Sequence, residues 1–298
     1  MRIVLAGALG EVGSALSRAL IETGHHVVPV SARAPIPRRP DVLPVAGLGL
    51  TDIDLLVNAS GPGDRRTGGR SGRSTAAALA QACRDAGVPG VLISTTRVLE
   101  GAQVPACGDD PSAPTTAYGR ANAALEEQWL ADGGGRVLRL ANFLCRPMSM
   151  ESPQAGLLPW SLVGEALQTG AISVRSAPSV SREFVDAYDV VRALAVVSEP
   201  DAPRITAMVP GSRMTMMDLA DAVARAFDAV GRPPPMAQFG SQSAQPPSLQ
   251  PGWLSQRGWQ PEVTSARLAV EIAEWIVDAA YTSTPGAGVH ADTGRGEP

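Results

Sequence analysis

Short apolar segments alternate with amphipathic segments through residues 1–142, and this alternation is the strongest constraint on the fold. Continuous apolar runs at residues 2–6, 26–30, 54–58, 90–94 and 136–140 have the length of strands buried on both faces. Helical periodicity at residues 12–22, 74–86 and 116–131 lies between most of them. Strands and helices at this spacing predict an α/β fold with a doubly wound parallel sheet, the Rossmann architecture.

The pattern changes after residue 142, where the expected elements become shorter. Helices are expected at residues 158–168, 187–197, 217–230 and 265–281, with a strand at 172–174. We therefore expect residues 1–142 to bind a dinucleotide and residues 143–281 to form mainly a smaller C-terminal substrate lobe, with returns to the sheet. Residues 231–251, rich in Pro, Ser and Gln, predict an extended linker, and residues 282–298 predict a disordered tail.

A glycine-rich turn joins the first predicted strand to the first helix. Its sequence, Gly7-Ala8-Leu9-Gly10-Glu11-Val12-Gly13, has the pattern G-x-x-G-x-x-G. Glycines there allow a sharp turn, let a pyrophosphate approach the backbone amides and let the helix pack close to the sheet. The turn therefore predicts dinucleotide binding by Gly7, Leu9, Gly10, Val12 and Gly13. The simpler alternative is a tight turn without a ligand, and the Glu11 carboxylate opposes a phosphate unless it points to solvent.

The end of the second strand bears on the choice of nicotinamide cofactor. An acidic residue there would hydrogen-bond the adenosine ribose hydroxyls, but the chain has Ser31-Ala32-Arg33 and no acid before Asp41. The Ser31 hydroxyl and the Arg33 guanidinium suit a 2′-phosphate. The sequence therefore favours NADP(H), with NAD(H) as the other choice; alternatively, Arg33 is a solvated loop residue.

Seven short motifs follow one another between residue 2 and about residue 280. They are the glycine turn, Asn58-Ala59-Ser60-Gly61, Ser94-Thr95-Thr96-Arg97-Val98, Tyr118-Gly119-Arg120-Ala121-Asn122, Arg139-Leu140-Ala141-Asn142, Ser181-Arg182-Glu183-Phe184-Val185-Asp186 and Gly258-Trp259-Gln260-Pro261. In this order they make the chain resemble the extended short-chain dehydrogenases/reductases, the NAD(P)-dependent nucleotide-sugar epimerase/dehydratase family.

The resemblance implies a role for several residues. Tyr118 would exchange a proton with a sugar hydroxyl or carbonyl, and Thr95 would hydrogen-bond the same oxygen. Asn122 takes the place of the family's active-site lysine. Further residues implied at the cofactor are Asn58, Ala59 and Ser60, and those implied at the nucleotide-sugar substrate are Thr96, Asn142 and Arg182. An arginine suits the substrate's diphosphate because its planar guanidinium can bridge two oxygens, although Arg182 could also be simply an exposed side chain.

All 25 cationic side chains are arginines, because the sequence contains no lysine. Coding bias is the simple explanation. In the family that the chain resembles, however, a lysine one helical turn after the tyrosine lowers the tyrosine pKa from about 10 and holds the nicotinamide ribose. Asn122 can donate to a ribose hydroxyl but carries no charge. We therefore expect Tyr118 to serve as a general acid in carbonyl reduction, which needs a proton delivered; alternatively, Tyr118 belongs to a vestigial site.

Together these features predict NADPH-dependent reduction of a keto-sugar nucleotide, as by a 4-ketoreductase of deoxysugar, secondary-metabolite or antibiotic biosynthesis. Two alternatives stay open: a nucleotide-sugar epimerase, and a catalytically silent NADP-binding sensor or scaffold. Dehydration is not expected, since Thr96 and Arg97 stand where the family's 4,6-dehydratases have an Asp-Glu pair.

Composition limits the other functions of the chain. A net charge of -4 and 4% aromatic residues do not favour a nucleic-acid surface, and no apolar run approaches the length of a membrane span. The cysteines, Cys83, Cys107 and Cys145, are widely separated, so neither a disulfide framework nor a metal site is expected. We expect a cytoplasmic protein with a small-molecule substrate; a homodimer stays open.

Overall fold

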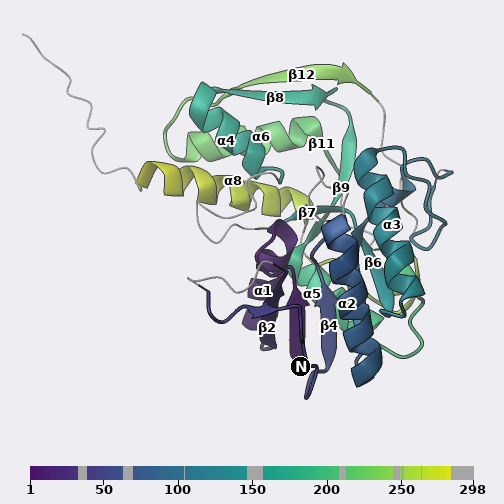
Figure 1. The fold of residues 1–298 in the computed structure, drawn as a ribbon. Coiled ribbons are helices and arrows are strands. Elements are labelled where there is room, and N and C mark those ends of the chain that lie inside the picture. The colour runs from purple at the N-terminus through teal and green to yellow at the C-terminus, as the bar shows by residue number, and fades with distance from the viewer. Residues whose placement is uncertain are drawn as a thin grey trace, which may run out of the picture.

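The structure is a computed structural model that describes residues 1–32, 39–62, 70–103, 105–145, 157–207, 213–243, 249, 252–262 and 264–282 (Figure 1). Its centre is a seven-stranded parallel sheet in the order β10-β6-β5-β4-β1-β2-β3. The strands are β1 (Arg2–Ala6), β2 (His26–Ser31), β3 (Leu43–Pro44), β4 (Leu55–Asn58), β5 (Gly90–Thr95), β6 (Arg136–Leu140) and β10 (Ile205–Ala207). The predicted α/β, doubly wound parallel sheet is confirmed.

Helices cover both faces of this sheet. One face packs against α1 (Glu11–Glu22) and α5 (Ala187–Val197), and the other packs against α2 (Arg70–Ala86) and α3 (Ala117–Ala131) (Figure 1). Consecutive strand residues point to opposite faces. In β1, Ile3 and Leu5 accordingly join the α1 and α5 cluster, whereas Val4 and Ala6 join the α2 and α3 cluster. Burial on both sides explains why these strands are continuous apolar runs.

The second half of the chain adds a smaller layer over the carboxyl ends of the central strands. It contains a three-stranded sheet, β11-β9-β7, and a two-stranded sheet, β12-β8. Its elements are β7 (Asn142–Leu144), α4 (Trp160–Thr169), β8 (Ala171–Ser176), β9 (Ser181–Asp186), β11 (Arg213–Thr215), α6 (Met216–Ala229), β12 (Met236–Gln242) and α8 (Ser265–Thr282). Helices α4, α6 and α8 share one hydrophobic cluster with these strands.

The chain also returns from this half to the central sheet. Strand β10 pairs with β6 at the sheet edge, α5 packs beside α1, and the short helix α7 (Trp253–Gln256) contributes Leu254 to the same cluster. The division at residue 142 into a dinucleotide-binding domain and a substrate lobe stays a prediction. No described helix has both the length and the apolar character needed to cross a membrane.

Two expectations about local structure need correction. The pattern predicts a linker over residues 231–251, but β12 lies within it and pairs in parallel with β8, Met236 opposite Ala171. Nearly all β12 side chains are exposed, so no apolar alternation marks this strand. The strands β3, β7, β9, β10 and β11 are likewise absent from the predicted set. Strand β3, for example, has two residues and its side chains are exposed. The predicted disordered tail lies, apart from Thr282, outside the described residues.

Candidate functional site

The predicted glycine turn lies between β1 and α1, at the carboxyl edge of the sheet. Gly7 has φ +79°, and a Cβ there would lie 2.6 Å from the backbone of Ser60. A Cβ on Gly13 would lie 2.1 Å from the carbonyl oxygen of Gly7. Gly10 caps α1 without any side-chain hydrogen bond to the helix. The turn therefore presents the amino end of a helix, where amide N–H groups and the helix dipole favour an anion.

The loop after β4 packs against this turn. The Asn58 side chain is fully buried, and its Oδ1 accepts hydrogen bonds from the Ser60 backbone N–H at 3.1 Å and from the Ser60 hydroxyl at 2.5 Å. The backbone N–H of Ala59 donates to Ala6 at 2.9 Å, which fixes the loop to the end of β1. Asn58 thus shapes the wall beside the glycine turn through its own hydrogen bonds, and Ala59 reaches the cavity described next.

A cavity of about 860 Å³ connects the two halves of the chain. Its wall includes Val12 and Ala59 near the glycine turn, and Phe184 and Met216 from the smaller layer. The predicted site residues Thr95, Tyr118, Asn122, Asn142 and Arg182 all line it. Parallel strands place their carboxyl ends on one edge of a sheet, and ligands of such folds bind there. The topology therefore gathers the predicted residues around one ligand-sized space.

The predicted catalytic side chains come from two adjacent elements. Thr95 ends β5, and its Oγ1 accepts a hydrogen bond from the Arg97 backbone N–H at 3.2 Å. Tyr118 lies in the first turn of α3 and is 40% exposed at the cavity. Asn122, one turn later, is 3% exposed, and its Nδ2 donates to the Tyr118 carbonyl oxygen at 2.9 Å. The side chain at the lysine position is therefore neutral and donates within its own helix.

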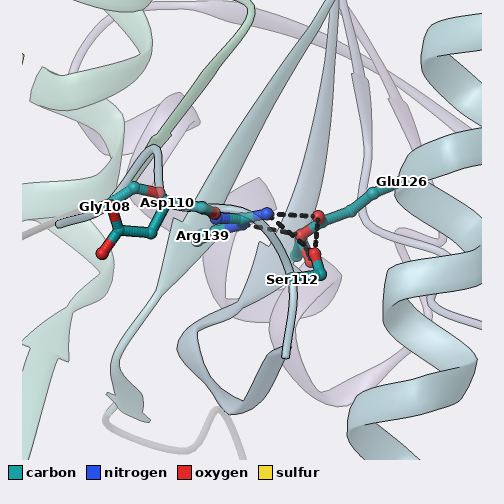
Figure 2. Close-up of polar contacts among 6 residues, drawn as sticks. Gly108, Asp110, Ser112, Glu126 and Arg139 are labelled. Carbon is teal, nitrogen blue, oxygen red and sulfur yellow. Dashed lines mark hydrogen bonds and ion pairs between the residues drawn. The ribbon is translucent and has the colours of Figure 1, made fainter. Parts of the chain in front are cut away.

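Arg139 and Glu126 form a buried ion pair (Figure 2). Glu126, on α3, accepts hydrogen bonds from Arg139 Nε at 3.1 Å and Nη2 at 2.8 Å, and from the Ser94 hydroxyl at 2.5 Å. Arg139 Nη1 also donates to the carbonyl oxygens of Gly108 at 3.0 Å and Asp110 at 2.7 Å. The network therefore ties α3, β5, β6 and the segment before α3 together, and its member Ser94 directly precedes Thr95.

Sequence reasoning missed this network, although two signals point to it. Glu126 follows Tyr118 and Asn122 at intervals of four residues, so all three share one helix face. Arg139 is a charge within the apolar strand run of residues 136–140, and a buried charge requires a partner.

The predicted substrate residues lie on the side of the cavity away from the glycine turn. Asn142 begins β7, and its Nδ2 donates to the Glu183 carbonyl oxygen at 2.8 Å. Arg182 lies in β9 and lines the cavity. Burial and the neighbouring Arg97 charge both lower the pKa of Arg182, whereas Glu100 raises it. Thr96 lines a smaller adjoining recess instead of the main cavity.

The remaining predicted cofactor residues are those of the glycine turn, Ser31 and Arg33. Gly7, Gly10 and Gly13 form the turn, whereas Ser31 is buried at the end of β2. Arg33, predicted for a 2′-phosphate, lies outside the described residues.

No protein-family profile matches the sequence, and no curated protein matches it. Solved structures do match the fold. They include the NAD-dependent NDP-hexosamine 5,6-dehydratase TunA, involved in tunicamycin biosynthesis, with 19% identity, TM-score 0.69, and 95% of this chain and 98% of that chain covered. A dTDP-glucose 4,6-dehydratase from Bacillus anthracis in complex with NAD has 15% identity and TM-score 0.71, with coverage of 96% and 97%.

A Thermus thermophilus UDP-glucose 4-epimerase in complex with NAD has 20% identity and TM-score 0.67, with 95% of this chain and 100% of that chain covered. All three matches extend over nearly the whole of both chains, so the likeness includes the smaller layer as well as the central sheet. The chain therefore has the fold of nucleotide-sugar dehydratases and epimerases, the group whose motifs its sequence resembles.

Proposed function

We propose that this protein is an NADPH-dependent reductase of a keto-sugar nucleotide, of the extended short-chain dehydrogenase/reductase type. The observation that carries the proposal is the cavity in which Thr95, Tyr118 and Asn122 lie together, between the glycine turn and Arg182. The fold shared with NAD-dependent nucleotide-sugar enzymes supports the same assignment.

The glycine turn and the residues near it fit a dinucleotide. The amino end of α1, which has no side-chain cap, would hold the pyrophosphate. The neighbouring backbone lies so close to Gly7 and Gly13 that neither position has room for a larger side chain. When bound, the nicotinamide would supply hydride to the substrate carbonyl. We propose NADP(H) over NAD(H) from the residues after β2, where no acidic side chain precedes Asp41.

Thr95 and Tyr118 would act on the carbonyl oxygen of the substrate. The Thr95 oxygen accepts from the Arg97 backbone, and its hydroxyl hydrogen would donate to a substrate oxygen in the cavity. Tyr118 would deliver its phenolic proton to the same oxygen as the carbonyl becomes an alkoxide. On the substrate side, Arg182 would hold a negatively charged part of the nucleotide sugar through its planar guanidinium.

The neutral Asn122 favours the reductive direction. Oxidation of an alcohol starts with a base, which would require Tyr118 to lose its proton near neutral pH. Asn122 provides no positive charge to stabilise a phenolate, and its Nδ2 is directed to the Tyr118 carbonyl oxygen. A protonated tyrosine, in contrast, is the form that reduction consumes.

The proposal is tested by NADPH consumption across a panel of keto-sugar nucleotides. We expect turnover with at least one of them and a loss of roughly 10²–10⁴-fold in Tyr118→Phe, the usual contribution of a general acid. Tyr281→Phe, which changes an exposed tyrosine on α8, is the matched control and should keep full activity. An unchanged rate in Tyr118→Phe would overturn the mechanism, and tighter binding of NADH than of NADPH would overturn the cofactor assignment.

A nucleotide-sugar 4-epimerase is the second candidate, favoured by the fold shared with the Thermus enzyme. An epimerase interconverts two alcohols without net use of cofactor, whereas a reductase consumes NADPH stoichiometrically. Chromatography of UDP-glucose incubated with the protein and NAD therefore separates the two functions. A protein that binds NADPH but does neither reaction would be the silent sensor or scaffold.

A further inference from the structure

A small recess adjoins the main cavity on the side where the predicted substrate residues lie. Its volume is about 30 Å³, and it shares Arg97, Asn142 and Arg182 with the wall of the main cavity. Thr96 lines the recess as well. Arg97, a residue of the recess wall, donates its backbone N–H to Oγ1 of Thr95, the residue that would bind the substrate carbonyl. A substituent that enters it would therefore belong to the sugar itself.

Two arginines line this recess, and only one of them forms an ion pair with a described carboxylate. Arg97 Nε lies 2.9 Å from Glu100 Oε1, and the second oxygen of Glu100 accepts from the Thr115 hydroxyl at 2.9 Å. Glu100 therefore fixes Arg97 through one edge of the guanidinium. The Nη groups of Arg97 make no ion pair or hydrogen bond within the described part of the chain.

The Arg182 side chain makes no ion pair or hydrogen bond to any described residue, although it is partly buried. Burial and the Arg97 charge lower the pKa of Arg182, and the Glu100 charge partly offsets them. The nearby Glu183 is paired with Arg213, their Oε1 and Nη1 atoms 3.5 Å apart. Two arginines and two glutamates line the recess, namely Arg97, Arg182, Glu100 and Glu183. Because Glu100 is paired with Arg97 and Glu183 with Arg213, Arg182 is the one charged group of this lining without an ion-pair partner among the described residues.

The size and charge of the recess select one kind of anion. A water molecule occupies about 10–15 Å³ of such space, so the recess holds roughly two oxygen-sized groups. The two oxygens of a carboxylate match that volume and balance one positive charge. A diphosphate has more oxygens and more charge than the recess can accommodate. Guanidinium groups also bind carboxylates at two points, with stronger hydrogen bonds than neutral donors make.

We propose that Arg97 and Arg182 bind a carboxylate on the sugar ring of the substrate, so that the protein selects an acidic nucleotide sugar over a neutral one. This inference rests on the proposed function, since it places the sugar at Thr95. It makes Arg97 a specificity-determining residue.

Calorimetric titration tests the proposal without any need for turnover. UDP, dTDP and GDP are titrated first, in the presence of saturating NADPH. The nucleotide that binds is then compared as its glucuronic acid and glucose derivatives. We expect the glucuronic acid derivative to bind about 10- to 100-fold more tightly, the effect of one or two charged hydrogen bonds. Arg97→Gln should remove most of this preference, by weakening binding of the glucuronic acid derivative far more than binding of the glucose derivative.

Arg225→Gln is the matched control, because it removes the same charge from the exposed side of α6 and lines neither cavity nor recess. Equal binding of the two derivatives to the unsubstituted protein would overturn the proposal. Equal weakening of both by Arg97→Gln would also overturn it, because Arg97 would then contact the diphosphate. If no nucleoside diphosphate binds, the proposed function itself is wrong. Unchanged NADPH affinity and urea midpoint verify that each variant is folded.

Discussion

Replacing Arg139 with methionine should destabilise the protein by about 3–5 kcal/mol, because the change leaves the Glu126 carboxylate buried without its cation. The side chains of Arg139 and Glu126 are only 1% and 3% exposed. Methionine also leaves the carbonyl oxygens of Gly108 and Asp110 without the Arg139 donor. Ser94 and Ser112 are the hydroxyl donors that remain for the carboxylate.

The structure also predicts how the double variant behaves. Glu126→Leu alone leaves the Arg139 guanidinium buried without its carboxylate partner. It should destabilise the protein by a similar amount, about 3–5 kcal/mol. Arg139→Met with Glu126→Leu removes both charges, so its destabilisation should fall well below the sum of the single effects. The expected coupling is about 3 kcal/mol, within the range of residues that share one buried network.

Urea unfolding followed by circular dichroism measures the free energy of unfolding of the unsubstituted protein, the two single variants and the double variant. The comparison requires that their m-values be similar. The exposed pair Arg267 and Glu271, with Nε and Oε1 2.7 Å apart, is the matched control. Arg267→Met should cost less than about 0.5 kcal/mol, because solvent screens an exposed helical pair. Additive single effects, or a loss for Arg139→Met as small as the control, would refute the view that the buried pair is tightly coupled.

Three further predictions concern the glycine turn, a buried carboxyl and the lysine position. Gly13→Ala should prevent NADPH binding and destabilise the protein by about 1–3 kcal/mol, because the added Cβ meets the Gly7 carbonyl oxygen at 2.1 Å. Gly164→Ala, in α4 with no atom within 4 Å of the new Cβ, should instead stabilise by about 0.5–1 kcal/mol, as thermal unfolding can verify. Burial raises the pKa of Asp186 to about 6 from 3.8. Its contribution to stability is therefore complete below pH 4 and is lost as the pH rises through 6, a difference of about 3 kcal/mol. Asp186→Asn should remove that part of the pH dependence of the urea midpoint, and an identical pH profile would contradict the assignment. Asn122→Lys places an ammonium one turn after Tyr118, so it should accelerate alcohol oxidation at neutral pH more than carbonyl reduction; equal effects in the two directions would argue against a charge effect on the phenol.

The sequence predicts β1, β4, β5 and β6 well because these strands are buried on both faces. Runs such as residues 90–94 are therefore apolar on both sides and are easily identified as buried strands. The glycine turn is identified by its position between a strand and a helix. Helix α5 is predicted at its observed bounds, Ala187–Val197, because Asp186 caps it and a clear apolar face follows. In β12 the side chains are exposed on both faces, so periodicity carries no signal there.

The candidate site was harder to predict in its electrostatics than in its location. The motifs indicate Thr95, Tyr118 and Arg182, and the topology of a parallel sheet gathers the ends of their elements. The pairing of Glu126 with Arg139, and the approach of Arg97 to Arg182, each join a helix residue to a strand residue distant from it in the sequence. Such contacts depend on side-chain directions that a one-dimensional pattern does not contain.

The return of the chain to the central sheet has a consequence for synthesis on the ribosome. When residue 145 has been added, the strands from β1 to β6 and the cover formed by α2 and α3 are complete. The opposite face still lacks α5 and Leu254. At about 5–20 residues per second, that apolar face waits roughly 5–20 s for its cover. The nascent chain therefore passes through a stage at which a chaperone could bind it, and a fragment ending near residue 145 should aggregate when expressed alone.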